Sequence, residues 1–289
     1  YRVLTRRRDS TPAPRGAVVP VAIVTMLAVL LSGGVLLRNR EYASRLTMAQ
    51  SIVDRWPSGR GHFLLASELF DQGRQDEALK QFEESAKTYP GALFALGTEY
   101  VAKGDYQNGV DALLGFIQAQ PEHPVVIPAR EMLASVYLTG GRLDLAEAQL
   151  RLLLARLPNH AAARRLLGDV RLRQNNPAQA VVEYQESLRL QPGQAETLGN
   201  LGVALSALNR FEEAANAMRE VVVLTPQDSA AHLLLGRVLS VLRKYEDAEA
   251  EFEAAVELDP SSRDAQANLE SVRRLIARAA GPGATAPRQ

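Results

Sequence analysis

The stretch Leu201–Pro226, LGVALSALNRFEEAANAMREVVVLTP, decides the fold of this chain. It begins with a leucine followed by a small residue and ends at a proline. Between them, small Ala214 is followed four residues later by large Met218, and Asn209 separates two apolar runs. Asparagine accepts the left-handed conformation that often follows a helix, and proline cannot continue a helix. The stretch therefore predicts two helices joined by a tight turn.

The same landmarks recur along most of the chain, and the last four prolines in the series are 34 residues apart. The prolines are Pro57, Pro90, Pro121, Pro158, Pro192, Pro226 and Pro260. The Leu-small pairs are Leu65-Ala66, Leu96-Gly97, Leu133-Ala134, Leu167-Gly168, Leu201-Gly202 and Leu235-Gly236. The turns carry Gly73, Gly104, Gly141, Asn175, Asn209 and, as an exception, Arg243.

Each unit is interpreted as a pair of antiparallel helices. Small residues on the first helix let the second approach closely, and large residues fill the space between neighbouring units. A single hairpin cannot bury its apolar face alone, so six in a row make one continuous core.

In its period, its small-residue positions and its terminal prolines, the chain resembles the tetratricopeptide repeat family. The resemblance implies an all-α fold, a right-handed α-solenoid of six helix hairpins over residues 59–260. Residues 261–280, with Leu269, Val272 and Ile276 at helical spacing, are predicted to form the polar capping helix of such an array. Residues 281–289 are predicted to be a disordered tail.

The resemblance also implies a groove that receives peptides or helices of partner proteins. Its lining comes from each first helix, at the residue two before the Leu-small pair and the residue just after it, which share one helix face. These residues are Phe63, Ser67, Phe94, Thr98, Glu131, Ser135, Arg165, Asp169, Gly199, Val203, Leu233 and Arg237. This lining is apolar in the first repeats and becomes charged in the middle ones.

Family members that bind chaperones hold a C-terminal carboxylate with a Lys and an Asn at these two places, and no repeat here has that pair. A heat-shock-chaperone adaptor is therefore rejected. Arg165 and Arg237 are candidates to receive an acidic partner, although exposed arginines on helices are more often simply solvated. Reversing both to Glu is expected to abolish capture and to leave thermal stability nearly unchanged.

The composition excludes several classes of function. The 289 residues hold 33 basic and 33 acidic side chains, so no excess of positive charge favours nucleic acid. Zero cysteines exclude disulfides, thiolate metal sites and cysteine nucleophiles. The dominance of arginine over lysine suggests a high-GC, bacterial genome.

The N-terminal residues have a different character. Residues 1–16 are basic, and Ala17–Leu37 holds twenty-one residues without a charge. At 1.5 Å per residue such a helix spans roughly 30 Å, the thickness of a bilayer's hydrocarbon core. We favour a transmembrane helix over two alternatives, a cleaved signal peptide and a buried helix. A signal peptide has a shorter apolar stretch, and a buried helix usually shows a polar stripe.

Five arginines precede this span and three follow it closely, which predicts that the repeats lie on the extracytoplasmic side of the cytoplasmic membrane. Residues 38–58 are predicted to form a linking helix that ends at Trp56-Pro57, where Trp56 is expected to plug the first repeat. A chain that begins at Tyr1 rather than at methionine predicts processing or a longer parent protein.

Catalytic signals are poor. His62, His123, His160 and His232 lack a second ligand at a metal-binding spacing, and we predict structural roles for His62 and His232. Neighbouring carboxylates such as Glu83-Glu84 are interpreted as solvated helix faces. The sequence thus predicts no cofactor, no metal site and no catalytic residue in this chain.

The junction after the span is a more specific pattern. Arg38-Asn39, Tyr42 and Trp56-Pro57 precede the first repeat. This arrangement resembles the C-terminal part of multi-pass, repeat-containing protein O-mannosyltransferase-like membrane proteins. In that family the chemistry belongs to acidic residues in an N-terminal extracytoplasmic loop, none of which exists in this chain.

Three hypotheses remain open. The chain is a membrane-anchored scaffold that binds a protein partner in its groove, or it is the accessory domain of a membrane glycosyltransferase whose catalytic part lies upstream of Tyr1. The third treats residues 17–37 as a cleaved export signal that leaves a soluble adaptor. In each case the predicted activity of these residues is protein binding.

Overall fold

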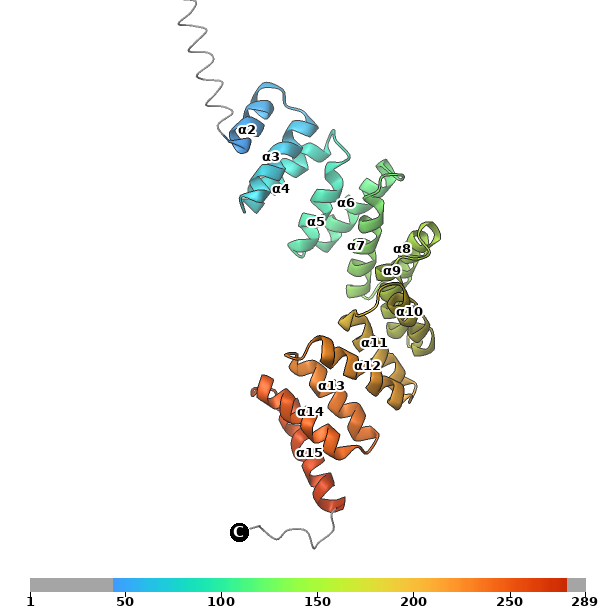
Figure 1. The fold of residues 1–289 in the computed structure, drawn as a ribbon. Helices are drawn as coiled ribbons and strands as arrows, with labels where there is room; N and C mark the ends of the chain where they lie inside the picture. Colours follow the sequence, from blue (N-terminus) through green and yellow to red (C-terminus); the bar gives the residue numbers. More distant parts are fainter. Residues whose placement is uncertain (1–43, 280–289) are drawn as a thin grey trace, which may run out of the picture. The chain divides into compact units, whose positions relative to one another are not determined.

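The computed structural model of the protein describes residues 44–279, and every regular element within them is an α-helix (Figure 1). Fourteen helices, α2 to α15, follow one another over these residues in an α-solenoid. The predicted transmembrane helix Ala17–Leu37, the basic segment before it and the predicted tail 281–289 lie outside the described residues. Among the helices of residues 44–279, none has both the length and the apolar character needed to cross a membrane.

The chain divides into two compact units, between Glu99 and Tyr100. The helices of the first unit, the last of which crosses the division, are α2 (Arg45–Arg55), α3 (Gly59–Asp71), α4 (Gln75–Ala86) and α5 (Ala92–Ala102). Helix α2 packs against α3, and α3 pairs with α4. Serine side chains begin the first two helices. Ser44 accepts from Thr47 N in a capping box, and Ser58 accepts from Gly61 N.

The second unit holds the remaining helices in hairpin order. They are α6 (Tyr106–Ala119), α7 (Val126–Thr139), α8 (Leu143–Arg156), α9 (Ala161–Arg173), α10 (Pro177–Leu190), α11 (Ala195–Ala207), α12 (Phe211–Leu224), α13 (Ser229–Val241), α14 (Tyr245–Leu258) and α15 (Arg263–Ala279). From α7 on, each helix packs against the next one along the chain. Second helices α8, α10, α12 and α14 each end two residues before a proline, as predicted.

The turns within hairpins have the predicted left-handed backbone. Gly73, Gly104 and Gly141 have φ values of 74°, 80° and 70°. Asn175 and Asn209 both have a φ of 59°. Arg243 occupies the equivalent place with a φ of 60°, although its Cβ makes this conformation unfavourable.

We expect Arg243→Gly to raise the free energy of unfolding by about 0.5–1 kcal/mol, because glycine carries no penalty at a positive φ. The greater freedom of glycine in the unfolded chain limits the gain. Urea unfolding followed by circular dichroism measures it. Asn209→Gly is the matched control and should gain less, since asparagine already tolerates this conformation. A loss of stability in Arg243→Gly would contradict the assigned turn.

Close approach within each hairpin depends on the small residue of the Leu-small pair. A Cβ built on Gly168 would lie 2.5 Å from Tyr184 Cε1, and one built on Gly236 would lie 2.6 Å from Phe252 Cε1. Tyr184 and Phe252 are fully buried. The small residues do let the second helix approach closely, as expected, but the large rings pack against the glycine of their own hairpin and not only between neighbouring units. These contacts belong to one apolar core that runs from α10 to α15 and includes the predicted capping-helix residue Val272.

Candidate functional site

The twelve predicted groove residues lie on the first helices of the hairpins. Phe63, Ser67, Phe94 and Thr98 belong to the first unit, on α3 and α5. The other eight belong to the second unit, on α7, α9, α11 and α13.

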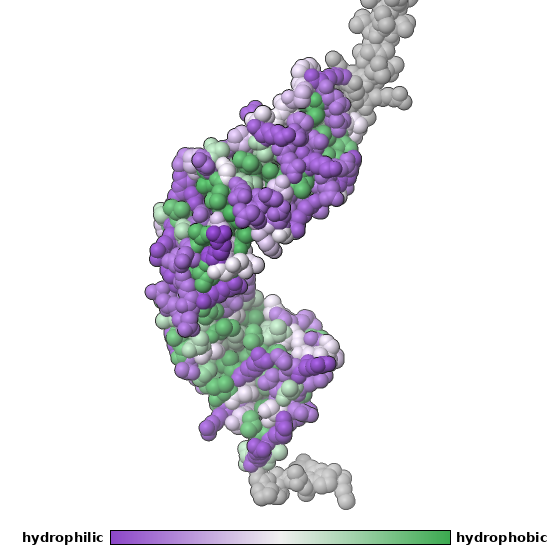
Figure 2. Space-filling model, turned by 180° about the vertical axis from the view of Figure 1, so that it is seen from behind, coloured by the Kyte–Doolittle hydropathy of each residue, from purple (hydrophilic) through white to green (hydrophobic). Residues whose placement is uncertain are grey.

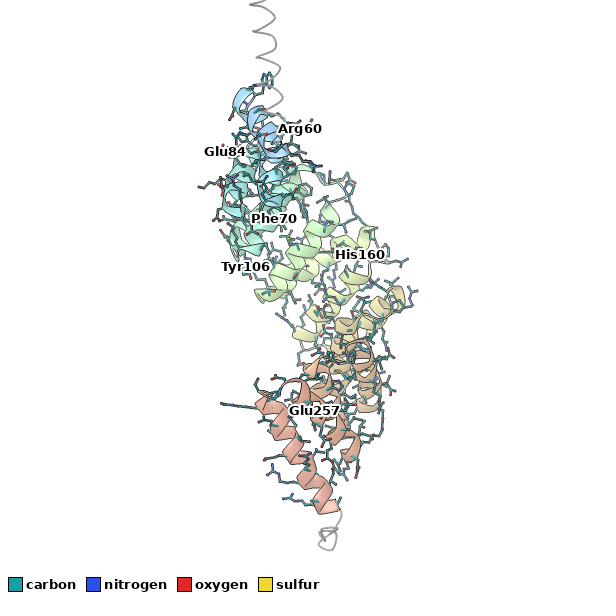
Figure 3. The ribbon with its side chains drawn as sticks, turned by 60° about the vertical axis from the view of Figure 1, so that its left-hand side comes forward. Arg60, Phe70, Glu84, Tyr106, His160 and Glu257 are labelled. Carbon is teal, nitrogen blue, oxygen red and sulfur yellow. The ribbon has the colours of Figure 1, made fainter. Side chains whose placement is uncertain are left out.

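In the first unit the predicted groove residues serve mainly internal packing. The Phe63 ring stands 5.7 Å from the Phe82 ring and 5.6 Å from the Tyr89 ring, centroid to centroid. The Ser67 hydroxyl donates to Phe63 O (3.0 Å), and the Thr98 hydroxyl donates to Phe94 O (2.9 Å). Arg60 lies at the start of α3 (Figure 3). Its guanidinium stacks over the Tyr89 ring, 5.7 Å from the ring centroid.

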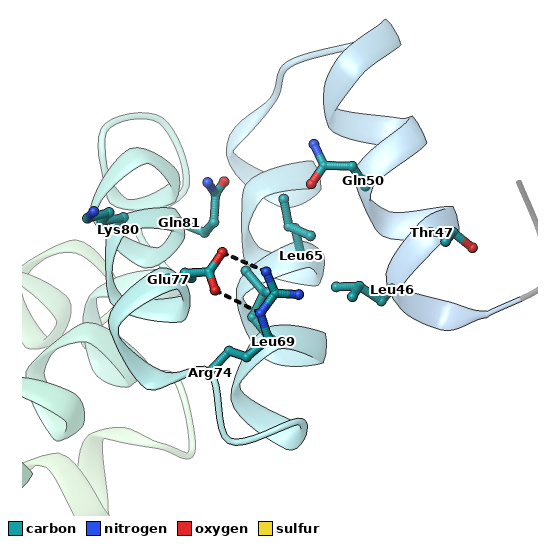
Figure 4. Close-up of a pocket in the computed structure, with 9 residues that line it drawn as sticks. All are labelled: Leu46, Thr47, Gln50, Leu65, Leu69, Arg74, Glu77, Lys80 and Gln81. Atoms are coloured by element: carbon teal, nitrogen blue, oxygen red, sulfur yellow. Dashed lines mark hydrogen bonds and ion pairs between the residues drawn. The ribbon is translucent and has the colours of Figure 1, made fainter.

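The first unit has an open pocket of about 340 Å³ elsewhere, between α2, α3 and α4 (Figure 4). Its apolar floor includes Leu65 and Leu69, and none of the predicted groove residues lines it. Arg74 crosses its edge and donates to both carboxylate oxygens of Glu77, at 2.8 and 2.6 Å. These hydrogen bonds lower the pKa of Glu77 below its usual value. This ion pair at the start of α4 compensates Arg74 and Glu77 without a ligand.

In the second unit, three predicted groove residues meet in what we call the polar pocket, about 370 Å³ in volume. It lies between α7, α9 and α11 and is lined by Ser135, Leu138, Arg165, Leu166, Asp169, Leu172, Arg173, Tyr184, Glu196 and Asn200. The structure thus brings Ser135, Arg165 and Asp169 together in one pocket.

The Asp169 carboxylate is the centre of the polar pocket. Its Oδ1 accepts from the Tyr184 hydroxyl (2.7 Å) and from Asn200 Nδ2 (2.9 Å). Its Oδ2 accepts from Arg165 Nη1 (3.0 Å). Burial and the neighbouring Asp169 carboxylate raise the pKa of Tyr184 well above its ordinary value, so the tyrosine stays a neutral donor. The network fixes Asp169 with three donors from two neighbouring hairpins.

Arg165 is held on both sides. Its Nη1 also donates to Glu196 Oε1 (2.8 Å), at the start of α11. The Arg165 and Asp169 side chains are only 20% and 14% exposed. Two carboxylates therefore compensate this cation already, and reversing its charge cannot leave stability unchanged. That part of the sequence-based expectation needs correction.

The second cluster of groove residues forms what we call the apolar crevice, about 220 Å³ in volume, between α11 and α13. It is lined by Val203, Ser206, Phe211, Met218, Leu234, Arg237, Val238 and Val241. Arg237 is the one charged side chain among these lining residues. Figure 2 shows, on one face, hydrophobic side chains gathered at the level of α11 and α12.

Gly199 and Leu233 complete the predicted set on these helices. Leu233 is half-buried and packs on the hydrophobic core. A Cβ built on Gly199 would meet no atom within 4 Å, unlike the crowded glycines of the Leu-small pairs. Gly199 therefore leaves a bare stretch of helix surface one turn before Val203.

We expect Gly199→Ala to raise the free energy of unfolding by about 1 kcal/mol, because alanine favours a helix interior and its methyl group meets open space. Gly168→Ala is the matched control. There the rigid Tyr184 ring blocks the methyl group, so stability should fall. Urea midpoints of the two variants measure the contrast, and equal shifts in one direction would contradict it.

Glu131 faces the start of the next hairpin rather than open groove. Its Oε1 lies 3.2 Å from Nδ1 of His160, the residue that caps α9 (Figure 3). The same nitrogen accepts from Ala163 N at 3.4 Å. A protonated ring can donate to Glu131 only by giving up that cap, so this contact is a helix-start contact and not a ligand site.

Polar pairs brace four hairpins, always between residues 19 apart. The bonded atoms are His62 Nδ1 and Gln81 Oε1 (2.8 Å), Arg130 Nη1 and Gln149 Oε1 (2.6 Å), Arg164 Nη1 and Glu183 Oε2 (2.9 Å), and His232 Nδ1 and Glu251 Oε2 (2.7 Å). The structural roles predicted for His62 and His232 are confirmed. Over residues 44–279, no group of three or more His, Asp or Glu side chains is placed to hold a metal ion.

Sequence reasoning missed Asn200, Glu196 and Val241. Asn200 had a detectable signal, because the residue just before the Leu-small pair is apolar in the five other repeats. Glu196 and Val241 lie outside the two positions considered per repeat. The expectation for Trp56 was wrong. Its side chain is 69% exposed at the end of α2, so it does not plug the first repeat.

Comparisons with solved structures show the same fold at low sequence identity. The C-terminal part of a repeat-containing protein of Cytophaga hutchinsonii superposes with a TM-score of 0.62 at 14% identity, over 82% of this chain and 97% of that one. Pseudomonas aeruginosa pilF gives 0.61 at 16% identity, over 74% and 97%. The APC/C hetero-tetramer Cut9-Hcn1 gives 0.60 at 18% identity, over 78% of this chain and 45% of that one.

No curated protein matches the chain in sequence. These comparisons lend no support to the resemblance to protein O-mannosyltransferase-like proteins. A family model described as tetratricopeptide repeat matches residues 30–93, 131–195 and 200–263, which is more than half of the sequence. Proteins of this fold are typically non-catalytic scaffolds that bind other proteins. The chain belongs to the tetratricopeptide repeat family.

Proposed function

We propose that the chain is a membrane-anchored scaffold that binds a protein partner through the groove of its second unit. The observation that carries the proposal is the alignment of two open pockets along successive first helices. The polar pocket lies between α7, α9 and α11, and the apolar crevice lies between α11 and α13. A partner segment laid across these helices meets hydrogen-bonding groups first and apolar surface next, the combination that gives protein interfaces both register and affinity.

A groove-blocking variant tests this function. Gly199→Trp projects a large ring from the bare stretch of α11, where nothing lies within 4 Å of the added Cβ. Val223→Trp places the same ring on α12, where the side chain is 79% exposed. Affinity capture from solubilised membranes should recover a protein with the wild type and with Val223→Trp, and lose it with Gly199→Trp. Equal recovery by both variants would refute a groove-dependent partner.

We further propose that the scaffold stands on the extracytoplasmic side of a bacterial cytoplasmic membrane. The support is the uncharged run Ala17–Leu37 and the five arginines before it. Because the chain has no cysteine, Val223→Cys provides a unique label site. A membrane-impermeant maleimide should modify it in intact spheroplasts. Modification only after lysis would place the repeats in the cytoplasm.

A second candidate function rests on one sequence observation, the junction Arg38-Asn39, Tyr42 and Trp56-Pro57. On this alternative, the repeats are the accessory domain of a multi-pass membrane glycosyltransferase and position its acceptor protein. Sequencing the native transcript upstream of the Tyr1 codon decides between the two. An open frame with further apolar spans and an acidic extracytoplasmic loop would favour the enzyme, and a nearby start codon would exclude it.

A further inference from the structure

We propose that the apolar crevice binds a short protein segment in which an apolar side chain stands beside a carboxylate. The inference rests on the proposed groove function and names the chemistry of the partner at one part of the groove. Three features of α11, α13 and α15 carry it: exposed apolar walls, a bare approach surface and a weakly held cation.

The walls of the crevice expose apolar surface that has no partner of its own. Val203 on α11 is 41% exposed and Val241 on α13 is 55% exposed, and both line the same hollow. Single exposed valines are ordinary on protein surfaces, but two that share a concave site present a place for an apolar side chain. A volume of about 220 Å³ accommodates one side chain of the size of leucine or phenylalanine.

The approach to the crevice is open to a polypeptide backbone. Gly199 lies one helical turn before Val203, on the same face of α11. With no side chain there and no atom within 4 Å of a built Cβ, a partner's main chain can lie directly on the helix. A glycine inside a helix lowers the stability of the fold. The close approach of a partner's main chain would explain why a glycine stands here.

The positive charge at the rim of the crevice favours a carboxylate beside the apolar side chain of the bound segment. Arg237 is the one charged residue that lines the crevice, and its side chain is 46% exposed. Its Nη2 donates to Asp264 Oδ2 at 3.1 Å, and the Asp264 side chain is 74% exposed. An exposed pair of this kind contributes little to stability, so an incoming carboxylate can replace Asp264 at little cost. Asp264 thus occupies the place that the partner's carboxylate would take.

Arg165 is less accessible to a partner's carboxylate than Arg237. It is 20% exposed and bonded to two carboxylates, so a partner would have to displace a half-buried network. The chain's own residues 280–289, AGPGATAPRQ, contain no acidic side chain and no apolar side chain larger than proline. They do not match the chemistry of the crevice, and the occupant proposed here is a separate protein.

The test uses the full chain in detergent micelles and a displayed library of random twelve-residue peptides as the probe. Enriched sequences should share an apolar residue with Asp or Glu within two positions. The most enriched peptide is then synthesised, and its affinity for each variant is measured by fluorescence anisotropy. Replacing its acidic residue with the matching amide should weaken binding about tenfold.

Two substitutions at the rim should move the affinity in opposite directions. Arg237→Gln should weaken binding about tenfold, because it removes a charge-assisted hydrogen bond. Asp264→Asn should tighten it about two- to fivefold, because Arg237 no longer has a competing carboxylate. Arg189→Gln, a matched change on α10 where the arginine is 63% exposed and also ion-paired, should leave the affinity unchanged.

Two further variants test the contribution of apolar contact to binding. Val203→Ser combined with Val241→Ser should weaken binding about tenfold by removing apolar contact. Val223→Ser, on an exposed valine outside the crevice, should have no effect.

Any of four results would overturn the inference: no enriched peptide, enriched peptides without an acid, weaker binding after Asp264→Asn, or tighter binding after residues 280–289 are deleted. A change of oligomeric state in the valine variants would assign the crevice to a second copy instead. One further outcome separates the two proposals. If Gly199→Trp abolishes partner capture but Arg237→Gln and the valine variants do not, the crevice is not the binding site, while the proposed groove function still holds.

Discussion

Tyr184→Ala is expected to lower the free energy of unfolding by about 3–5 kcal/mol, the usual cost of removing a buried aromatic ring. Tyr184 is fully buried and fills the space that Gly168 leaves between α9 and α10. Its hydroxyl also holds Asp169 in the polar pocket at 2.7 Å. The variant therefore loses core packing and one donor to a half-buried carboxylate. Urea unfolding followed by circular dichroism measures the loss.

Tyr184→Phe separates the two contributions. It keeps the ring against Gly168 and removes only the hydroxyl donor, so about 1 kcal/mol should be lost. A Tyr184→Ala variant no less stable than Tyr184→Phe would contradict the hairpin packing, because the ring would then contribute nothing. Partner capture should fall with Tyr184→Phe only if the orientation of Asp169 matters for binding.

Arg165→Glu is expected to lower the free energy of unfolding by about 2–4 kcal/mol, because it removes the cation from a half-buried network and adds a third carboxylate beside Asp169 and Glu196. The Asp169 side chain is only 14% exposed, so water screens the new repulsion poorly. Thermal and urea unfolding measure the effect.

Arg237→Glu is the matched control for that reversal. It makes the same change of charge on the first helix of another hairpin, but the side chain is 46% exposed and bonded to one exposed carboxylate. Its effect on stability should stay within about 0.5 kcal/mol. Equal losses of stability from Arg165→Glu and Arg237→Glu would show that burial does not determine how much the Arg165 network contributes to stability.

The hairpins could be predicted from the sequence because their determinants are local. Asn175, Asn209 and even Arg243 were located by their spacing from the prolines, and each has the left-handed φ that a tight turn requires. The close approach of the two helices at Gly168 was expected from its small size, but the structure was needed to show that Tyr184 of the same hairpin fills the space beside it.

The site could be predicted only in part. Repeat spacing selected Arg165, Asp169, Val203 and Arg237, which line the two pockets of the second unit, but it says nothing about bonds between repeats. Arg165 bonds to Glu196, 31 residues away on the next hairpin, and that contact changes its role from a free cation to a structural one. The expectation for Trp56 was wrong for a similar reason. The position of a residue along a helix does not fix the direction of its side chain at the helix end.

The most direct test of the groove is a photo-crosslink formed in native membranes. A photo-reactive phenylalanine analogue replaces Val241, at the rim of the apolar crevice, or Val223, exposed on α12. On the present account, light joins a distinct partner protein to position 241 and not to position 223. No adduct at 241, or the same adduct at both positions, would contradict the claim that this groove is where the chain binds its partner.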